Sequence, residues 1–143
     1  MTGSHDPHEH TEVQQGPQGV DDHLFTPAEL ARIDEALTLG SEESGLYFSV
    51  YIGHLDVPAR GHAERLHAQL GPVASRAVLI AVSPGQRTVE IVTGEESSLR
   101  LPDNACALAA LSMTAAFGAG DLAGGIATGL RMLSDRSGHP VLR

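Results

Sequence analysis

Residues 76–94 read RAVLIAVSPGQRTVEIVTG, and this stretch decides the fold. The continuous apolar run Ala77–Val82 has the length and the β-branched content of a strand that is covered on both faces. Ser83–Gln86 follows, and its Pro and Gly at the two central positions predict a type II turn. Thr88–Thr93 then places Val89 and Ile91 on one face and Thr88, Glu90 and Val92 on the other, which predicts a half-buried strand antiparallel to the first. The stretch is therefore predicted to be a hairpin that ends at Gly94.

A second apolar segment, upstream of the hairpin, enlarges the predicted sheet. Leu46–Gly53 (LYFSVYIG) carries large apolar residues on both faces, which predicts another interior strand. A helix is expected to begin at Asp56 or a neighbouring residue and to stop at Gly71. Its apolar stripe consists of Ala59, Ala63, Leu66 and Leu70. A strand, a crossover helix and a second strand predict that the two strands are parallel and that the crossover is right-handed.

Three further helices are expected around this unit. The first is capped by Thr26 and Glu29 and stops at Gly40. The other two follow the hairpin and are predicted to be capped by Asp103 and Asp121. The predicted fold is therefore α/β, an αβαββαα sandwich with a small mixed sheet of at least three strands and helices on both faces.

The chain divides into one predicted domain and two terminal segments. Residues 25–134 form the domain. Residues 1–24 are rich in His, Gln, Gly and acids and almost lack large apolar residues, which predicts a disordered acidic tail. His5, His8 and His10 could bind a divalent metal, but a flexible polar tail is favoured. Residues 135–143 are expected to fray.

Composition limits the range of partners. The formal net charge is −9, and acids outnumber basic residues in both the tail and the domain. A nucleic-acid binder needs a basic face, so we expect no nucleic-acid partner. The single cysteine, Cys106, excludes an intrachain disulfide and fits a reducing compartment.

The chain is also expected to be cytoplasmic. Its first residues lack the basic and apolar pattern of a secretory signal. Ala105–Leu133 is long enough to cross a bilayer, but five glycines and Asp121 interrupt it, so two buried helices are favoured over a membrane span. Peripheral association with a membrane through these Ala/Gly-rich helices is a weaker alternative. We expect a monomer.

The histidines outside the tail show no catalytic pattern. His54 and Asp56 lie just beyond the carboxyl end of the first strand, where open α/β sheets often bind ligands, but a loop or capping role is favoured. His62 and His67 are five residues apart and diverge by about 140° on a helix, so we expect them on the surface or flank of that helix. No nucleophile–base constellation, phosphate-binding glycine loop or dinucleotide fingerprint is present.

Four carboxylates form the candidate site. Glu95 and Glu96 follow the last strand, and Asp103 and Asp121 start the last two helices. If those helix starts gather at one edge of the sheet, the oxygens could hold Ca²⁺ or Mg²⁺. The alternative, which is somewhat favoured, is that the aspartates only cap helices and the glutamates are solvated.

Four short motifs, taken in order, carry a resemblance to a known family. They are VLIAV at 78–82, VEIVTG at 89–94, LPD at 101–103 and FxxGDLxxGI at 117–126. Together they resemble the TPM domain, which occurs in a thylakoid-lumen acid phosphatase, in photosystem II repair proteins and in many bacterial membrane-linked proteins. The resemblance covers about Phe25–Leu133. It implies an α/β sandwich, divalent-metal binding in some members and acid phosphatase activity in a few.

The resemblance places family positions on particular residues of this chain. The strand-ending glycine falls on Gly94, the aspartate after it on Asp103, and a late Gly–Asp pair on Gly120 and Asp121. The family usually has Asp-Asn-Gly before the second strand and an acidic residue after the glycine, and this chain departs at all four positions. These positions are Ser75, Arg76, Ala77 and Ser98. The departures should weaken a cation site, and they suggest a divergent bacterial branch that we expect to be actinobacterial.

The favoured function is that of a non-catalytic TPM-like module that binds a protein or a small molecule. The alternative is a divalent-metal-dependent phosphatase in which Asp103, Asp121 and Glu95 or Glu96 hold Ca²⁺ or Mg²⁺, which polarises a phosphoryl oxygen or activates water. In that scheme Asp103 is the one candidate nucleophile. The Ser75–Ala77 and Ser98 departures favour the first function over the second.

Overall fold

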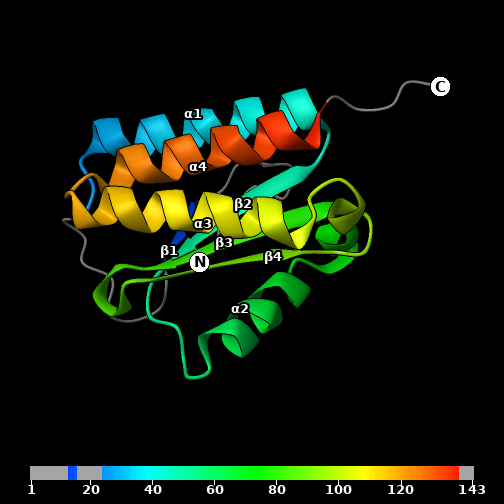
Figure 1. Cartoon of the computed structure of the whole chain (residues 1–143), viewed down its shortest axis with the longest axis horizontal. Helices are drawn as coiled ribbons and strands as arrows, with labels where there is room; N and C mark the ends of the chain where they lie inside the picture. Colours follow the sequence, from blue (N-terminus) through cyan, green and yellow to red (C-terminus); the bar gives the residue numbers. More distant parts are fainter. Residues whose placement is uncertain (1–12, 16–23, 139–143) are drawn as a thin grey trace, which may run out of the picture.

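A four-stranded mixed sheet in the order β1-β2-β3-β4 forms the centre of the protein (Figure 1). This computed structural model describes residues 13–15 and 24–138. The strands are β1 (Val13–Gln15), β2 (Tyr47–Ile52), β3 (Ala77–Ser83) and β4 (Thr88–Thr93). β1, β2 and β3 are parallel, and β4 is antiparallel to β3. The predicted parallel pair and the predicted hairpin are both confirmed, and β4 is an edge of the sheet.

Helices cover both faces of the sheet. They are α1 (Pro27–Ser44), α2 (Ala59–Ala68), α3 (Asp103–Gly118) and α4 (Leu122–Ser137). Short 3-10 turns lie at Gly71–Arg76 (η1), Pro84–Gln86 (η2) and Ser97–Leu99 (η3). α1, α4 and α3 lie side by side in that order on one face, and α2 lies on the other (Figure 1). The predicted α/β sandwich is therefore confirmed.

The central strands supply residues to a separate core on each face. All residues of β2 and β3 are buried, as strands covered on both faces require. The larger core faces α1, α3 and α4 and takes from these two strands Phe48, Val50, Ile52, Val78, Ile80 and Val82. The smaller core faces α2 and takes from them Tyr51, Leu79 and Ala81. Successive side chains of each strand thus alternate between the two cores, as the geometry of a strand requires.

The first helix begins as predicted but ends later. Thr26 Oγ1 accepts from the Glu29 amide at 3.1 Å, and Glu29 Oε1 accepts from the Thr26 amide at 2.8 Å. The predicted stop at Gly40 is wrong, because the left-handed C-cap is Gly45, with a φ of 79°. Gly40 is a buried residue inside the helix, and a Cβ there would make an ordinary contact with the ring of Phe48 at 3.4 Å.

The turn between β3 and β4 also differs from its prediction. Pro84–Gln86 form a 3-10 turn, and the left-handed residue is Arg87, with a φ of 53°, rather than Gly85. The predicted type II turn is therefore wrong. The Gln86 side chain stabilises this corner by bonding both the amide and the carbonyl of Leu55, each at 2.9 Å.

The two aspartates predicted as helix caps behave differently. Asp121 Oδ1 accepts from the Gly124 amide at 3.0 Å and caps α4 as predicted. At α3 the N-cap is Pro102, and Asp103 is the first helical residue and makes no capping bond with its side chain. Asp103 still favours the helix there, because a carboxylate in the first turn interacts well with the helix dipole.

The terminal segments contain more structure than expected. β1 lies inside the predicted disordered tail and pairs with Val50–Ile52, so that prediction fails for its three residues. The other residues of the predicted tail before Leu24, with His5, His8 and His10, lie outside the described residues. α4 continues through Ser137, past the predicted start of fraying at residue 135, and residues 139–143 are not described. Within 24–138 no helix has the length and apolar character needed to cross a bilayer.

Candidate functional site

A buried serine joins the end of β4 to the start of β3. The Ser97 hydroxyl donates to the Ala77 carbonyl at 2.9 Å and accepts from the Gly94 amide at 2.8 Å. The register of the hairpin places Gly94 opposite Ala77, so the hydroxyl replaces one rung of the ladder. His67 Nε2 lies 3.2 Å from the same carbonyl and must be the donor, because a carbonyl only accepts. His67 is buried, whereas the sequence predicted that it would lie on the surface or flank of its helix.

The chain approaches itself closely at Gly94. A Cβ built there would lie 2.5 Å from the Ser75 carbonyl oxygen and closer still to that of Ala74. Two residues on, the Glu96 amide donates to the Ser75 carbonyl at 2.8 Å and lies 3.3 Å from the Ser75 hydroxyl. Gly94, a position that carries the family resemblance, thus contacts Ser75, a position at which this chain departs from the family. Ser75 uses its oxygens to hold the loop backbone.

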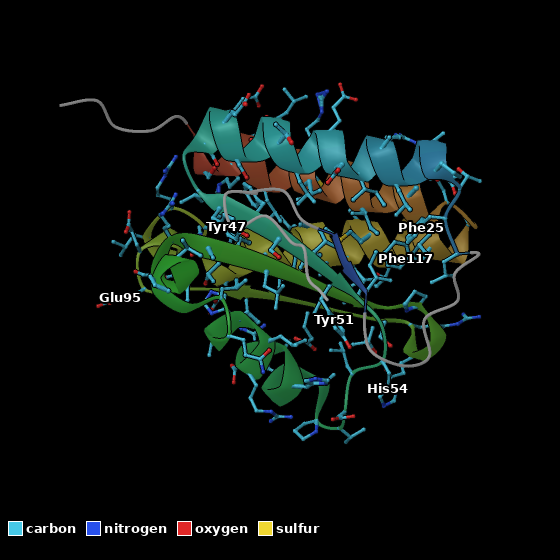
Figure 2. All side chains as sticks on the ribbon, turned by 180° about the vertical axis from the view of Figure 1, so that it is seen from behind. Phe25, Tyr47, Tyr51, His54, Glu95 and Phe117 are labelled. Atoms are coloured by element: carbon cyan, nitrogen blue, oxygen red, sulfur yellow. The ribbon has the colours of Figure 1, made fainter. Side chains whose placement is uncertain are left out.

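The four predicted carboxylates lie at opposite ends of α3. Glu95 and Asp103 are in or next to the connection between β4 and α3. Arg100, in the same connection, donates to the carbonyls of Ser137 and Gly138 at 3.1 and 2.9 Å, so this end lies beside the C-terminus of α4. Asp121 caps the N-terminus of α4, and a 16-residue helix is about 24 Å long. Figure 2 shows Glu95 at one end of the molecule and Phe117, near the end of α3, at the other.

The predicted convergence of carboxylates is therefore not found. Within residues 13–15 and 24–138 no group of three or more His, Cys, Asp or Glu side chains is arranged so that it could hold a metal ion. Asp121 uses a carboxylate oxygen as a helix cap. Glu95, Glu96 and Asp103 share one end of the sheet, and all three are exposed.

A polar loop after β2 holds His54 and Asp56 against α2. The Asp56 amide donates to His62 Nδ1 at 2.8 Å, and Asp56 Oδ1 lies 3.5 Å from His54 Nε2. Because His62 Nδ1 accepts a hydrogen bond, it cannot also donate to the Asp56 carboxylate 4.0 Å away. Burial, and to a lesser extent Asp56, raises the pKa of Tyr51, whose hydroxyl donates to the His54 carbonyl at 2.8 Å. These bonds fit the favoured loop role, but neither side chain caps α2, whose N-cap Pro58 has no side-chain capping bond.

A groove with a volume of about 500 Å³ runs between α3 and the outer edge of β4. We call it the α3–β4 groove. Its residues are Arg60 from α2, Val89, Glu90 and Ile91 from β4, and Asp103, Cys106, Ala107, Ala110, Leu111 and Thr114 from α3. The groove joins an exposed helix flank to a strand edge, so its walls offer both apolar side chains and backbone groups.

Hydrogen bonding within the sheet shows which backbone groups face this groove. The Val82 carbonyl accepts from the Gly53 amide at 3.0 Å, so residues 78, 80 and 82 bond toward β2, and residues 79, 81 and 83 bond toward β4. The register of the hairpin then shows that residues 88, 90 and 92 of β4 direct their backbone hydrogen bonds toward β3. The outward peptide groups are those of Val89, Ile91 and Thr93.

Arg60 covers part of this edge. Its Nη1 donates to the Ile91 carbonyl at 2.8 Å, which agrees with an outward direction for that group. The same guanidinium lies 3.4 Å from Glu90 and 3.3 Å from Glu64. Among the described residues no hydrogen bond reaches the outward groups of Val89 and Thr93. An unpaired strand edge is a template for pairing, and a charged side chain is one way to protect it.

Cys106 in the groove wall is poorly suited to covalent chemistry. Burial raises the pKa of its thiol, Asp103 raises it further, and Arg60 opposes part of the shift. The thiolate is the nucleophilic form, so a raised pKa leaves the group protonated at neutral pH. The groove therefore offers binding contacts rather than a nucleophile.

The sequence indicates neither the bridging serine nor the groove. Ser97 lies in a short polar run with no distinguishing pattern, and it is identified only by its buried contacts. Arg60 appears as an ordinary charge on α2, and its role depends on the contact between α2 and β4. One feature of the sequence does bear on the groove. The polar residues of β4, beside the continuous apolar run of β3, are typical of a strand that is less covered.

We expect Ser97→Ala to lower the free energy of unfolding by about 1–3 kcal/mol, because it leaves the Gly94 amide without its buried acceptor. Ser98→Ala is the matched control, since that side chain is exposed and bonds only to the Glu95 carbonyl at 3.0 Å. Urea denaturation of both variants measures the difference. Equal stability of the two variants would contradict the bridging role of Ser97.

Curated relatives show similarity over most of the chain. An uncharacterised protein of Mycobacterium tuberculosis, Rv2468c, is 36% identical over 112 residues, and its counterpart in a second strain of that organism is equally similar. The match spans 77% of this chain and 65% of the relatives' own length, so these relatives are longer than the region they share with it.

Solved structures share the fold at low sequence identity. The N-terminal domain of a Porphyromonas gingivalis protein has a TM-score of 0.74 at 19% identity and covers 92% of this chain and 87% of its own. The N-terminal domain of cg2496 from Corynebacterium glutamicum has a TM-score of 0.67 at 14% identity, with 87% and 78% covered. The BA42 protein of Bizionia argentinensis has a TM-score of 0.68 at 15% identity, with 83% and 85% covered. These similarities show the fold alone.

A family profile matches residues 10–134, which is most of the chain and includes every described helix and strand up to the last turn of α4. The profile is described as a domain of unknown function, DUF5130. The match together with the 36% identity to the mycobacterial relatives establishes the relationship. The chain belongs to the DUF5130 family.

Proposed function

We propose that this domain is a non-catalytic module that binds a protein partner through the outer face of α3 and the α3–β4 groove. The observation that carries the proposal is a pair of large apolar side chains exposed on the outer side of α3. Leu108 is 58% exposed and Leu111 66%. Exposed apolar surface of this kind, gathered beside an open strand edge, is typical of interaction sites.

The composition of α3 supports this proposal. Its inner face buries Ala105, Cys106, Ala109 and Met113. Its outer face is also apolar, with an exposed stripe that consists of Ala107, Leu108, Leu111 and Ala115. A helix that is apolar all round is typically covered on both sides. Within the described residues nothing covers the outer side of α3, so a partner is the natural cover.

The phosphatase that the TPM resemblance implies has weaker support. The fold-level similarity to solved α/β domains supports a TPM-like architecture, which remains a proposal at this level of identity. A metal-dependent phosphatase would need its carboxylates in one site. Asp121 lies about a helix length from Asp103, and this separation supports binding over catalysis. The contacts of Ser75 also support binding, because its oxygens hold the loop amide.

Photo-crosslinking in cells that naturally produce the chain tests the proposal. With a benzophenone side chain in place of Leu111, we expect one defined protein adduct, because that position lies in the exposed stripe. The matched control is the same side chain in place of Leu39, which is 49% exposed on α1. Leu108→Glu should abolish the adduct at Leu111 and leave the melting temperature nearly unchanged, because its side chain is exposed.

Three outcomes would contradict the proposal. The first is an equal yield of adducts at Leu111 and Leu39. The second is an adduct at Leu111 that persists in Leu108→Glu. The third is an adduct with the mass of two copies of the chain, which would indicate self-association in place of partner binding.

A further inference from the structure

We infer that the partner enters the α3–β4 groove as an extended, positively charged segment whose backbone pairs with β4 as a fifth strand. This inference rests on the proposed function and specifies the chemistry of the partner. Three features carry it: the unpaired outer edge of β4, the small side chains of the facing helix flank, and an excess of carboxylates around Arg60.

The edge of β4 provides backbone groups at the right spacing. The outward amides and carbonyls belong to Val89, Ile91 and Thr93, which are alternate residues of one strand. Six residues of β4 extend for about 20 Å, enough to pair with a short extended segment. Main-chain hydrogen bonds supply affinity in this mode of recognition, and alternate side chains supply specificity.

The α3 side of the groove leaves room for those side chains. An added strand lies about 4.8 Å from β4, which places it along the flank of α3. That flank presents Cys106, Ala107 and Ala110 next to Leu111. Small residues allow close approach, and Leu111 provides apolar cover, so alternate residues of the segment should be apolar and of modest size.

Charge decides between two occupants of the groove. Glu64 and Glu90 pair with Arg60, the one cation among the described residues that line the groove, and Asp103 lines the groove as well. A second copy of this chain would bring the same excess of negative charge to the interface, and like charges placed together oppose association. A segment with Lys or Arg at alternate positions complements the carboxylates. Charge complementarity therefore favours a basic partner over self-pairing.

Arg60 has to be displaced before the segment can pair with the middle of β4. Its guanidinium must leave the Ile91 carbonyl before an incoming amide can donate there. The ion pairs that hold Arg60 are partly exposed and long, 3.3 and 3.4 Å, so their release is a small barrier. Once Arg60 has moved, Glu64 and Glu90 become free to pair with cations of the segment.

A designed peptide tests the inference on the full chain. The probe is a seven-residue peptide of alternating valine and lysine with blocked ends. One control copy carries N-methyl groups that remove its amide donors, and another carries glutamate in place of lysine. With the probe, we expect amide hydrogen exchange at Val89, Ile91 and Thr93 to slow by about tenfold or more, as it does in paired strands. Neither control copy should produce this protection.

Variants of the groove refine the test. Arg60→Ala should bind the probe about threefold more tightly, because it removes both the competing donor and a like charge. Glu90→Gln should bind it about threefold more weakly, because a complementary charge is lost. Arg65→Ala is the matched control on α2, since that residue is exposed and lies outside the groove.

The outcomes separate this inference from the function on which it rests. Unchanged exchange at millimolar probe, equal binding of the N-methylated copy, or weaker binding to Arg60→Ala would overturn the added strand. If the crosslinked partner at Leu111 nevertheless persists, the interaction module stands without it. If neither the slowed exchange nor the crosslink at Leu111 is observed, both the added strand and the interaction module are overturned.

Discussion

Replacing Gly94 by alanine is expected to lower the free energy of unfolding by about 3 kcal/mol or more. The added Cβ would lie 2.5 Å from the Ser75 carbonyl oxygen and nearer still to that of Ala74. Both are backbone atoms, so no side-chain rotation can relieve the clash. To make room, the loop has to move away from η1. That movement breaks the bond from the Glu96 amide to Ser75 and the bridge through Ser97.

Urea denaturation followed by circular dichroism measures this effect. Gly85→Ala is the matched control, because Gly85 lies in the turn at the other end of the hairpin and its added Cβ meets nothing within 4 Å. That variant should be within about 0.5 kcal/mol of the parent, or slightly more stable. A Gly94→Ala protein as stable as Gly85→Ala would show that the loop can yield and that glycine is not needed there.

The strands could be predicted because their patterns report local burial. The continuous run of Ala77–Val82 reflects cover on both faces, and the polar residues of Thr88–Thr93 reflect a less covered strand, although Ile91 and Val92 are buried on opposite faces. The ends of the first helix were harder to predict. Gly40 and Gly45 both satisfy the signal for a helix stop, and only tertiary packing distinguishes the residue that contacts Phe48 from the left-handed cap.

The four carboxylates do not gather, for a reason that lies in topology. Asp103 and Asp121 each precede a helix, which suggested that they would gather. The two helices are joined by a tight turn and pack against each other, so the start of one lies beside the end of the other. Two helix starts joined in this way are separated by about one helix length, here about 24 Å. A short Gly-Ala-Gly link between two apolar segments therefore argues against a shared site at their N-termini.

The α3–β4 groove could not be read from the sequence for a different reason. It depends on which strand is at the edge, and the order of strands in a sheet follows from the packing of the whole domain. The outer leucines of α3 were visible in the sequence, but in an Ala-rich helix they are indistinguishable from core positions. Their exposure is a property of the folded domain.

The packing of α3 on α4 predicts that the effect of one substitution on stability changes sign when a second residue is also replaced. Gly129 of α4 faces Met113 of α3, and a Cβ there would lie 2.7 Å from Met113 Cγ, 3.0 Å from Sδ and closer to Cε. Met113 is fully buried and cannot swing clear without disturbing the core. We expect Gly129→Ala to be destabilising by about 1–3 kcal/mol, because overpacking outweighs the gain in helix propensity.

In a Met113→Ala background the same change should stabilise the protein. Met113→Ala alone removes the three atoms that clash and should cost about 2–5 kcal/mol through the cavity it leaves. Gly129→Ala then partly fills that cavity and adds helix propensity, for a gain of about 1 kcal/mol. Urea denaturation of the four proteins gives the coupling energy directly. If Gly129→Ala changes the free energy of unfolding in the same direction and by the same amount in both backgrounds, the glycine does not serve close packing of α3 on α4. The cause of its effect would then lie within α4 itself, in the backbone of the helix rather than in its contact with Met113.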